Sequence, residues 1–185
     1  MIQQQAPTFN FLIIQPFVRP KNQKNNPCTK KSLPSVLIDF TAMTLCELLP
    51  TRRTIKEGRS LPELLFFVQK ITHQAEINCR TLLVALIYLQ RAKSHLPRRA
   101  VGCDDTAHRM FLGALLLASK FLKDSAWTTT TLTNRQLFHH CNGLFSMEEI
   151  YQLEKAFLKL IRYNCWLDDK DLNDFVLFHR QDFSI

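Results

Sequence analysis

Two charged residues, Glu154 and Lys120, stand among apolar neighbours at helical spacing. If residues 146–162 form a helix, five apolar residues lie within about 60° of Glu154 on its surface: Met147, Ile150, Phe157, Leu158 and Ile161. Lys120 directly follows the run Leu115–Ser119 in an earlier predicted helix. A carboxylate and an ammonium group flanked by hydrophobic side chains are suited to hydrogen-bond the backbone of a second protein. The pair therefore predicts a partner-binding face.

Both positions also have an interpretation that needs no partner. Lys120 closes its predicted helix, and a base is favourable near a helix C-terminus. Glu154 can lie at the edge of the apolar face with its carboxylate in water, which avoids the cost of burying an unpaired charge. Spacing alone leaves the two interpretations open.

No set of residues has the spacing of a catalytic or metal centre. His139, His140 and Cys141 are adjacent, so on a helix they point about 100° apart and cannot all reach one metal ion. Four aspartates lie at a predicted helix start, where acids complement the helix dipole and a metal-binding cluster is the alternative: Asp168, Asp169, Asp171 and Asp174. The four glycines are scattered and cannot build a phosphate-binding loop. We expect a protein that is not an enzyme and that holds no cofactor and no metal.

Composition and charge describe a globular domain with a basic tail. The chain has 185 residues, 46% hydrophobic and 22% charged, with a formal net charge of +8, as expected for about one domain. Residues 1–35 hold five bases and no acid, which leaves 19 bases and 16 acids for the rest. A basic tail suggests a polyanion, an acidic protein surface or an import signal, and the alternative is a solvated arm that binds nothing.

The cysteines and the apolar runs indicate a compartment. Six cysteines are spread at wide intervals without a C-x-x-C pair, and the first 18 residues lack the pattern of a secretory signal. We therefore expect a reduced, intracellular location, in the nucleus or cytoplasm or both. No apolar run reaches the roughly 18 residues that a membrane span needs, so no membrane partner is expected.

Hydrophobic periodicity predicts an all-α fold. The helices are expected near residues 36–49, 60–71, 78–95, 104–123, 133–141, 146–162 and 172–179. Ser60 with Glu63, Thr133 with Gln136, and Ser146 with Glu149 form possible capping boxes. The helix near 104–123 is apolar on every side at its centre, so other helices must enclose it.

The chain is accordingly divided into four parts. Residues 1–34 form a basic tail that we expect to be disordered, and residues 35–59 an N-terminal helix and a linker. Residues 60–166 form the domain of five helices around a central apolar one, and residues 167–185 a C-terminal helical segment.

Several motifs of residues 60–166 resemble the cyclin box. Leu115–Phe121 (LLLASKF) is similar to its third-helix signature, and Leu153–Leu160 (LEKAFLKL) to its fifth. Arg80–Leu89 (RTLLVALIYL) is similar to its second helix. Further segments resemble fungal Pcl-type cyclins in particular: His108–Gly113, Lys120–Ser125 and Leu144–Ser146.

The resemblance implies a single cyclin box that binds a cyclin-dependent protein kinase and activates it, in cell-cycle or nutrient-linked control. In the family, the lysine of the third helix and the glutamate of the fifth touch the kinase, and these positions match Lys120 and Glu154. By the same matching, the apolar part of the interface is Leu117, Phe121, Leu158 and Tyr163. The helix within 35–59 matches the extra helix that many cyclins place before the box.

One departure and one rival function remain. Residues 61–65 (LPELL) lack the arginine of the docking patch found in cell-cycle cyclins, so a substrate-docking patch there stays open. The rival is a cyclin-fold transcription or nucleic-acid-binding module. Outside the tail the acids nearly balance the bases, and aromatic residues do not interleave with the bases, so we do not expect nucleic acid as a partner.

Overall fold

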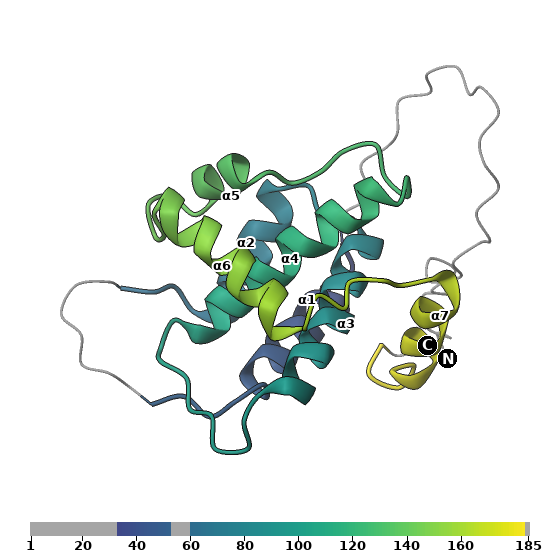
Figure 1. Ribbon diagram of the computed structural model, residues 1–185, viewed down its shortest axis with the longest axis horizontal. Helices are drawn as coiled ribbons and strands as arrows, with labels where there is room; N and C mark the ends of the chain where they lie inside the picture. The colour runs from purple at the N-terminus through teal and green to yellow at the C-terminus, as the bar shows by residue number, and fades with distance from the viewer. Residues whose placement is uncertain (1–32, 53–59, 184–185) are drawn as a thin grey trace, which may run out of the picture. The chain divides into compact units, whose positions relative to one another are not determined.

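The computed structural model describes residues 33–52 and 60–183. They fall into two compact units, one within residues 31–166 and one that contains residues 167–185. The first unit holds α1 (Ser35–Cys46), α2 (Leu64–Gln74), α3 (Cys79–His95), α4 (Thr106–Asp124), α5 (Asn134–His140) and α6 (Met147–Leu160), and the second holds α7 (Asp169–Phe178). Figure 1 shows this helical organisation. In the described ranges the only β-pairing is an isolated bridge between Thr51 and Gly102.

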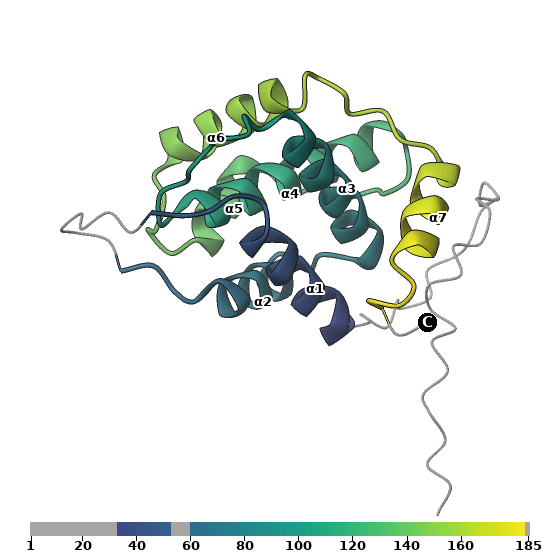
Figure 2. The same ribbon diagram turned by 90° about the horizontal axis from the view of Figure 1, so that it is seen from below.

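Helix α4 is the centre of the larger unit. Every residue from Phe111 to Ser119 is buried, because α3 and α6 pack along α4 while α1 and α2 cover it further. Figure 2 shows α6 on one side of α4, and α1 and α2 on the other. The predicted all-α fold, with a central apolar helix and an extra helix before the box, is confirmed.

Local capping fixes where α5 and α6 begin. Thr133 Oγ1 accepts from the Gln136 backbone N at 3.2 Å, and Gln136 Oε1 accepts from the Thr133 backbone N at 2.9 Å. Ser146 and Glu149 make the same reciprocal pair at the start of α6. Both predicted capping boxes are confirmed. They make Asn134 the first residue of α5 and place Glu154 two turns into α6.

The capping box predicted at Ser60 and Glu63 is wrong. Helix α2 begins only at Leu64, and its N-cap Glu63 is extended and makes no side-chain cap. Pro62 disfavours helical backbone at the residue before it. Its carbonyl also accepts a hydrogen bond from His108 of α4 at 2.9 Å, so a tertiary contact fixes this segment where the local pattern predicted helix.

Other predictions lie outside the described residues. The disorder expected for residues 1–34 falls there apart from positions 33 and 34, and so does most of the linker expected before residue 60. The four-part division of the chain stays a prediction. None of the described helices combines the length and the apolar character needed to cross a membrane.

The buried imidazole of His108 gives a pH-dependent prediction. His108 is 6% exposed and its ring lies edge-on to Phe67, with centroids 4.8 Å apart. Nε2 lies 2.9 Å from the Pro62 carbonyl, whereas buried Nδ1 has no hydrogen-bond partner among the described residues. Burial lowers the pKa of His108 below its usual 6.5, although the Pro62 carbonyl and Asp105 act in the opposite direction. The neutral tautomer that donates from Nε2 therefore fits this site.

Acidification should destabilise the domain through His108. As pH falls below about 6.5, the His108 imidazole becomes protonated in the unfolded chain but stays neutral in the folded protein. The free energy of unfolding therefore decreases. Thermal melts at pH 7 and pH 5 should show a larger drop in Tm for the wild type than for His108→Gln, which keeps a donor but does not titrate. His73→Gln, at an exposed position, should behave like the wild type. An equal drop in all three proteins would contradict this assignment.

The end of α4 gives a second prediction. Ala126 has φ 58°, and the Ala126 and Trp127 backbone N atoms donate to the carbonyls of Lys123 and Leu122, which is the Schellman pattern. This conformation costs alanine about 1–2 kcal/mol, more than the roughly 0.4–1 kcal/mol of unfolded-chain entropy that glycine adds.

Ala126→Gly should therefore stabilise the protein by about 0.5–1 kcal/mol, measured by denaturant unfolding. Ala156→Gly, at an exposed position inside α6, should destabilise it by about 1 kcal/mol. If both substitutions shifted stability in the same direction, the backbone explanation would fail.

Candidate partner-binding site

The two charges singled out by their spacing meet at one point. Lys120 Nζ of α4 lies 2.5 Å from Glu154 Oε1 of α6. Lys120 Nζ also donates to Asn134 Oδ1 at 2.8 Å, and Asn134 Nδ2 donates to Glu154 Oε2 at 2.7 Å. The three side chains close a ring that joins α4, α5 and α6. We call this ring the Lys–Asn–Glu cluster.

Close packing of α4 against α6 makes the cluster possible. Gly113 lies two helical turns before Lys120, and a Cβ placed on it would come within 2.8 Å of the Phe157 Cβ. Near the start of both helices, Arg109 pairs with Asp105 at 2.6 Å and with Glu149 at 2.9 Å. A residue without a side chain and a bridging arginine thus align the two helices.

One residue of the cluster is buried, and the other two are partly exposed to solvent. Asn134 is buried at 6% exposure, whereas the side chains of Lys120 and Glu154 are 35% and 19% exposed. A lysine has three N–H donors and a carboxylate about four acceptor sites, so donor and acceptor capacity remains for a second protein. The two charges pair with each other and are also partly exposed to solvent. The structural interpretation and the partner-binding interpretation, which the spacing left open, are therefore compatible.

The predicted apolar residues differ in their exposure. Leu117 is buried at 7% and lies one turn before Phe121 on α4. Phe121 and Leu158 are half-buried, and Leu158 lies one turn after Glu154 on α6. Tyr163, beyond the end of α6, is 64% exposed. Leu117 is therefore enclosed by the helix packing, while the side chains of the other three reach solvent at least in part.

Sequence reasoning missed three residues of this surface. Asn134 completes the cluster, and its only signal was its place next to the Thr133 cap. Tyr151, 46% exposed, lies three residues before Glu154 on the same face of α6. Trp166, 73% exposed, places its ring 6.4 Å from that of Phe121, and its position after the last helix of the unit gave no signal.

The other candidates remain ordinary structural residues. His139 is exposed, His140 half-buried and Cys141 buried, and burial raises the pKa of the Cys141 thiol to about 12. Asp168 caps α7 through the Asp171 backbone N at 2.8 Å, as acids at a helix start are expected to do. Within the described ranges, no group of His, Cys, Asp and Glu is placed to hold a metal ion.

Comparison with known families assigns the chain to a class. The model of the cyclin N-terminal domain matches residues 39–165. This range takes in most of α1 and all of α2–α6, and it contains every residue of the Lys–Asn–Glu cluster. The chain therefore belongs to the cyclin family.

Curated relatives come from the yeast Saccharomyces cerevisiae. The chain is 29% identical over 152 residues to PHO85 cyclin-9, across 78% of this chain and 47% of that protein. It is 34% identical over 112 residues to PHO85 cyclin-1, across 60% of this chain and 38% of that protein. The chain thus spans less than half the length of these relatives. The matches confirm the resemblance to fungal Pcl-type cyclins. No solved structure matches the chain.

Proposed function

We propose that this chain is the regulatory subunit of a cyclin-dependent protein kinase, and that it binds the kinase through the outer face of α4 and α6. This α4–α6 face consists of Lys120, Phe121, Tyr151, Glu154, Leu158 and Tyr163, with Leu117 beneath it. The Lys–Asn–Glu cluster is the observation that supports the proposal most. A buried amide holds two accessible charges in place before any partner arrives, in the middle of apolar and aromatic side chains.

Such a face can activate a kinase by selecting one of its conformations. A kinase regulatory helix has an inactive and an active position, and a rigid surface that binds only the active one shifts the population towards it. A shift from 1:99 to 99:1 requires about 5.5 kcal/mol of differential affinity. The cluster is already ordered by its internal hydrogen bonds, so binding loses little side-chain entropy there.

The relatives indicate where to look for the partner. Their names connect them with PHO85, and we infer a partner kinase of the same kind for this chain. In this account the kinase carries out phosphoryl transfer, and the chain supplies no catalytic group. We further infer an intracellular role in cell-cycle or nutrient-linked control.

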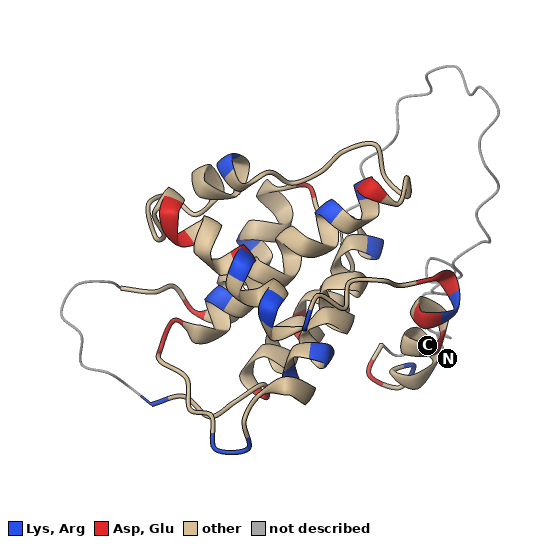
Figure 3. Cartoon of the chain, in the orientation of Figure 1, with Lys and Arg blue, Asp and Glu red and all other residues tan. Residues whose placement is uncertain are grey.

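The charges of the described residues do not favour the rival nucleic-acid-binding function. Figure 3 shows acidic residues among the bases: α4 and α6 carry both kinds and α7 carries three acids with one base, although α3 carries bases alone. A phosphate backbone is bound by a stripe or patch of bases.

Reconstitution tests the proposal. The full chain is mixed with yeast PHO85, and separately with other cyclin-dependent kinases, and phosphoryl transfer to a protein substrate is measured alongside co-elution in gel filtration. We expect one kinase to co-elute with the chain and to gain at least tenfold in rate, while the chain alone transfers nothing. Absence of both effects across the panel, or a salt-dependent shift of DNA or RNA instead, would contradict the proposal.

A further inference from the structure

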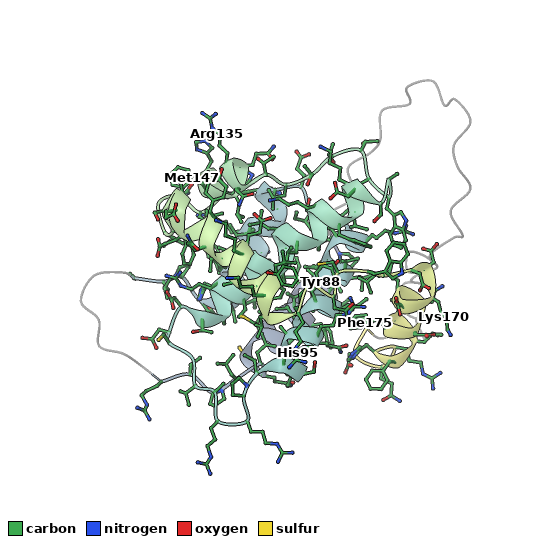
Figure 4. The ribbon with its side chains drawn as sticks, viewed as in Figure 1. Tyr88, His95, Arg135, Met147, Lys170 and Phe175 are labelled. Atoms are coloured by element: carbon green, nitrogen blue, oxygen red, sulfur yellow. The ribbon has the colours of Figure 1, made fainter. Side chains whose placement is uncertain are left out.

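The segment that follows α6, Tyr163–Trp166, is held by two side chains of α3. Tyr88 Oη donates to the Cys165 carbonyl at 2.6 Å. Arg91 Nη1 donates to the carbonyls of Asn164 at 2.8 Å and Trp166 at 3.0 Å. Three consecutive carbonyls are therefore bound by residues that lie three positions apart on one face of a helix. Figure 4 labels Tyr88 amid the helices of the larger unit.

Local backbone hydrogen bonds hold the start of this segment. Arg162 and Tyr163 have φ values of 53° and 59°, and their backbone N atoms donate to the carbonyls of Lys159 at 2.9 Å and Leu158 at 3.0 Å, which is the Schellman pattern at the end of α6. The Asn164 and Cys165 backbone N atoms donate to the carbonyls of Ile161 at 3.0 Å and Tyr163 at 2.9 Å. The carbonyls of Asn164, Cys165 and Trp166 are bound instead by the side chains of α3.

The segment carries two of the most exposed aromatic side chains in the larger unit. Tyr163 is 64% exposed and Trp166 is 73% exposed. The Trp166 ring lies edge-on to Phe121, with centroids 6.4 Å apart, and Phe121 directly follows Lys120. The Trp166 ring therefore adjoins the α4–α6 face at Phe121. Exposed Trp and Tyr are side chains that concentrate binding energy in protein interfaces.

The two holding residues are themselves well placed. Tyr88 is completely buried, so its hydroxyl has a fixed direction. The Arg91 guanidinium lies over the Tyr88 ring at 5.8 Å from its centroid. Both carbonyls accept from the same Nη1 atom of Arg91, which the rigid guanidinium plane holds in place. The pair forms a fixed clamp on a segment that lacks regular structure.

We propose that Tyr88 and Arg91 are positioning residues for partner binding: they clamp the Tyr163–Trp166 segment so that Tyr163 and Trp166 extend the α4–α6 face. This inference rests on the proposed function, because the partner is the same kinase. Neither positioning residue needs to touch the kinase. They act by holding the segment in place. Trp166 then contacts the kinase, although the interface residues implied by the resemblance to cyclins did not include it.

The clamp is tested first without any kinase. The chain has two tryptophans, so Trp127→Phe leaves Trp166 as the only fluorescent indole. In this background, Arg91→Ala and Tyr88→Phe should lower the fluorescence anisotropy of Trp166 and raise its quenching by acrylamide. Arg91→Lys should be intermediate. Lys93→Ala, at an exposed position on the same helix, should leave both signals unchanged. Unchanged signals in Arg91→Ala and Tyr88→Phe would overturn the clamp.

Kinase binding is tested second, with a double-mutant cycle. Trp166→Ala and Arg91→Ala should each weaken binding about tenfold, and the double variant should be no weaker than Trp166→Ala alone, because both remove the same contact. Additive losses, or wild-type affinity in Arg91→Ala despite a loosened Trp166, would overturn the inference and leave the proposed function standing. Failure of the wild type to bind any kinase would overturn the proposed function, and the positioning role with it.

Discussion

Lys120→Ala and Glu154→Ala are each expected to weaken kinase binding by about 30-fold or more, which corresponds to the roughly 2 kcal/mol or more lost at an interface hot spot. Each substitution removes one charge and leaves the other without its partner at the centre of the α4–α6 face. Folding stability should fall as well, by about 1–3 kcal/mol, because each substitution leaves the buried Asn134 amide without one of its two hydrogen-bond partners. Affinity by calorimetry and Tm by thermal melts measure the two effects separately.

A charge swap separates recognition from stability. Lys120→Glu combined with Glu154→Lys restores an ion pair across α4 and α6 but exchanges the donor and the acceptor that a partner meets. We expect the swapped protein to melt near the wild type and still to bind poorly. Lys123→Ala and Glu148→Ala, at exposed positions on the same helices, are the matched controls and should bind normally. Wild-type affinity of the swapped protein would show that the pair serves only the fold.

Gly113→Val is expected to have the largest effect on stability. A Cβ at this position would lie 2.8 Å from the Phe157 Cβ and 3.0 Å from its Cγ, closer than van der Waals contact allows. These atoms lie near the backbone of α6, so the helices must separate. Overpacking of this kind costs about 1–3 kcal/mol, and we expect the upper part of that range because both residues lie inside the helix contact. For a chain of this size, Tm should fall by roughly 5–10 °C.

The same change should disturb the site. Separation of α4 from α6 pulls Lys120 away from Glu154, so kinase affinity should fall together with Tm. Phe157→Ala removes the Cγ and the ring but keeps the Cβ, so in that background Gly113→Val should cost less stability than in the wild type without becoming neutral, a coupling that a double-mutant cycle detects. Equal costs of Gly113→Val with and without Phe157 would show that the close approach is not the cause.

Local patterns predicted a large part of this structure from the sequence. The capping boxes at Thr133 and Ser146 were found because capping depends on residues three positions apart. Helical geometry brought Glu154 to notice because a carboxylate interrupts an apolar face. Lys120 was noticed because it directly follows an apolar run on another helix, and the resemblance to cyclins then assigned both charges to a kinase interface.

Contacts between distant segments were beyond such patterns. Asn134 is unremarkable in the sequence, and its role depends on α5 meeting α4 and α6. The hydrogen bonds from Tyr88 and Arg91 to the segment after α6 span more than 70 residues, so no spacing rule detects them. The failure at Ser60 has the same cause, because the Pro62 carbonyl bonds to His108 of α4 where the sequence predicted the first turn of a helix.

The geometry of the Lys–Asn–Glu cluster is compatible with a structural role and a binding role at the same time. A buried amide, Asn134, orients both charges, so the cluster stabilises the junction of three helices. The remaining exposed fraction of the charges faces outward. The same hydrogen bonds can stabilise the contact of three helices and fix the orientation of two charged groups for a partner.

Site-specific photo-cross-linking tests the central claim most directly. The photoreactive residue p-benzoylphenylalanine is placed at Leu158 or Tyr163 on the α4–α6 face, or at Met43 or Phe66, which are 59% and 58% exposed on α1 and α2, and each protein is irradiated with the kinase. We expect a covalent cyclin–kinase product from positions 158 and 163 and none from 43 and 66. Cross-links from α1 or α2 alone, with positions 158 and 163 silent, would show that the kinase binds a different surface.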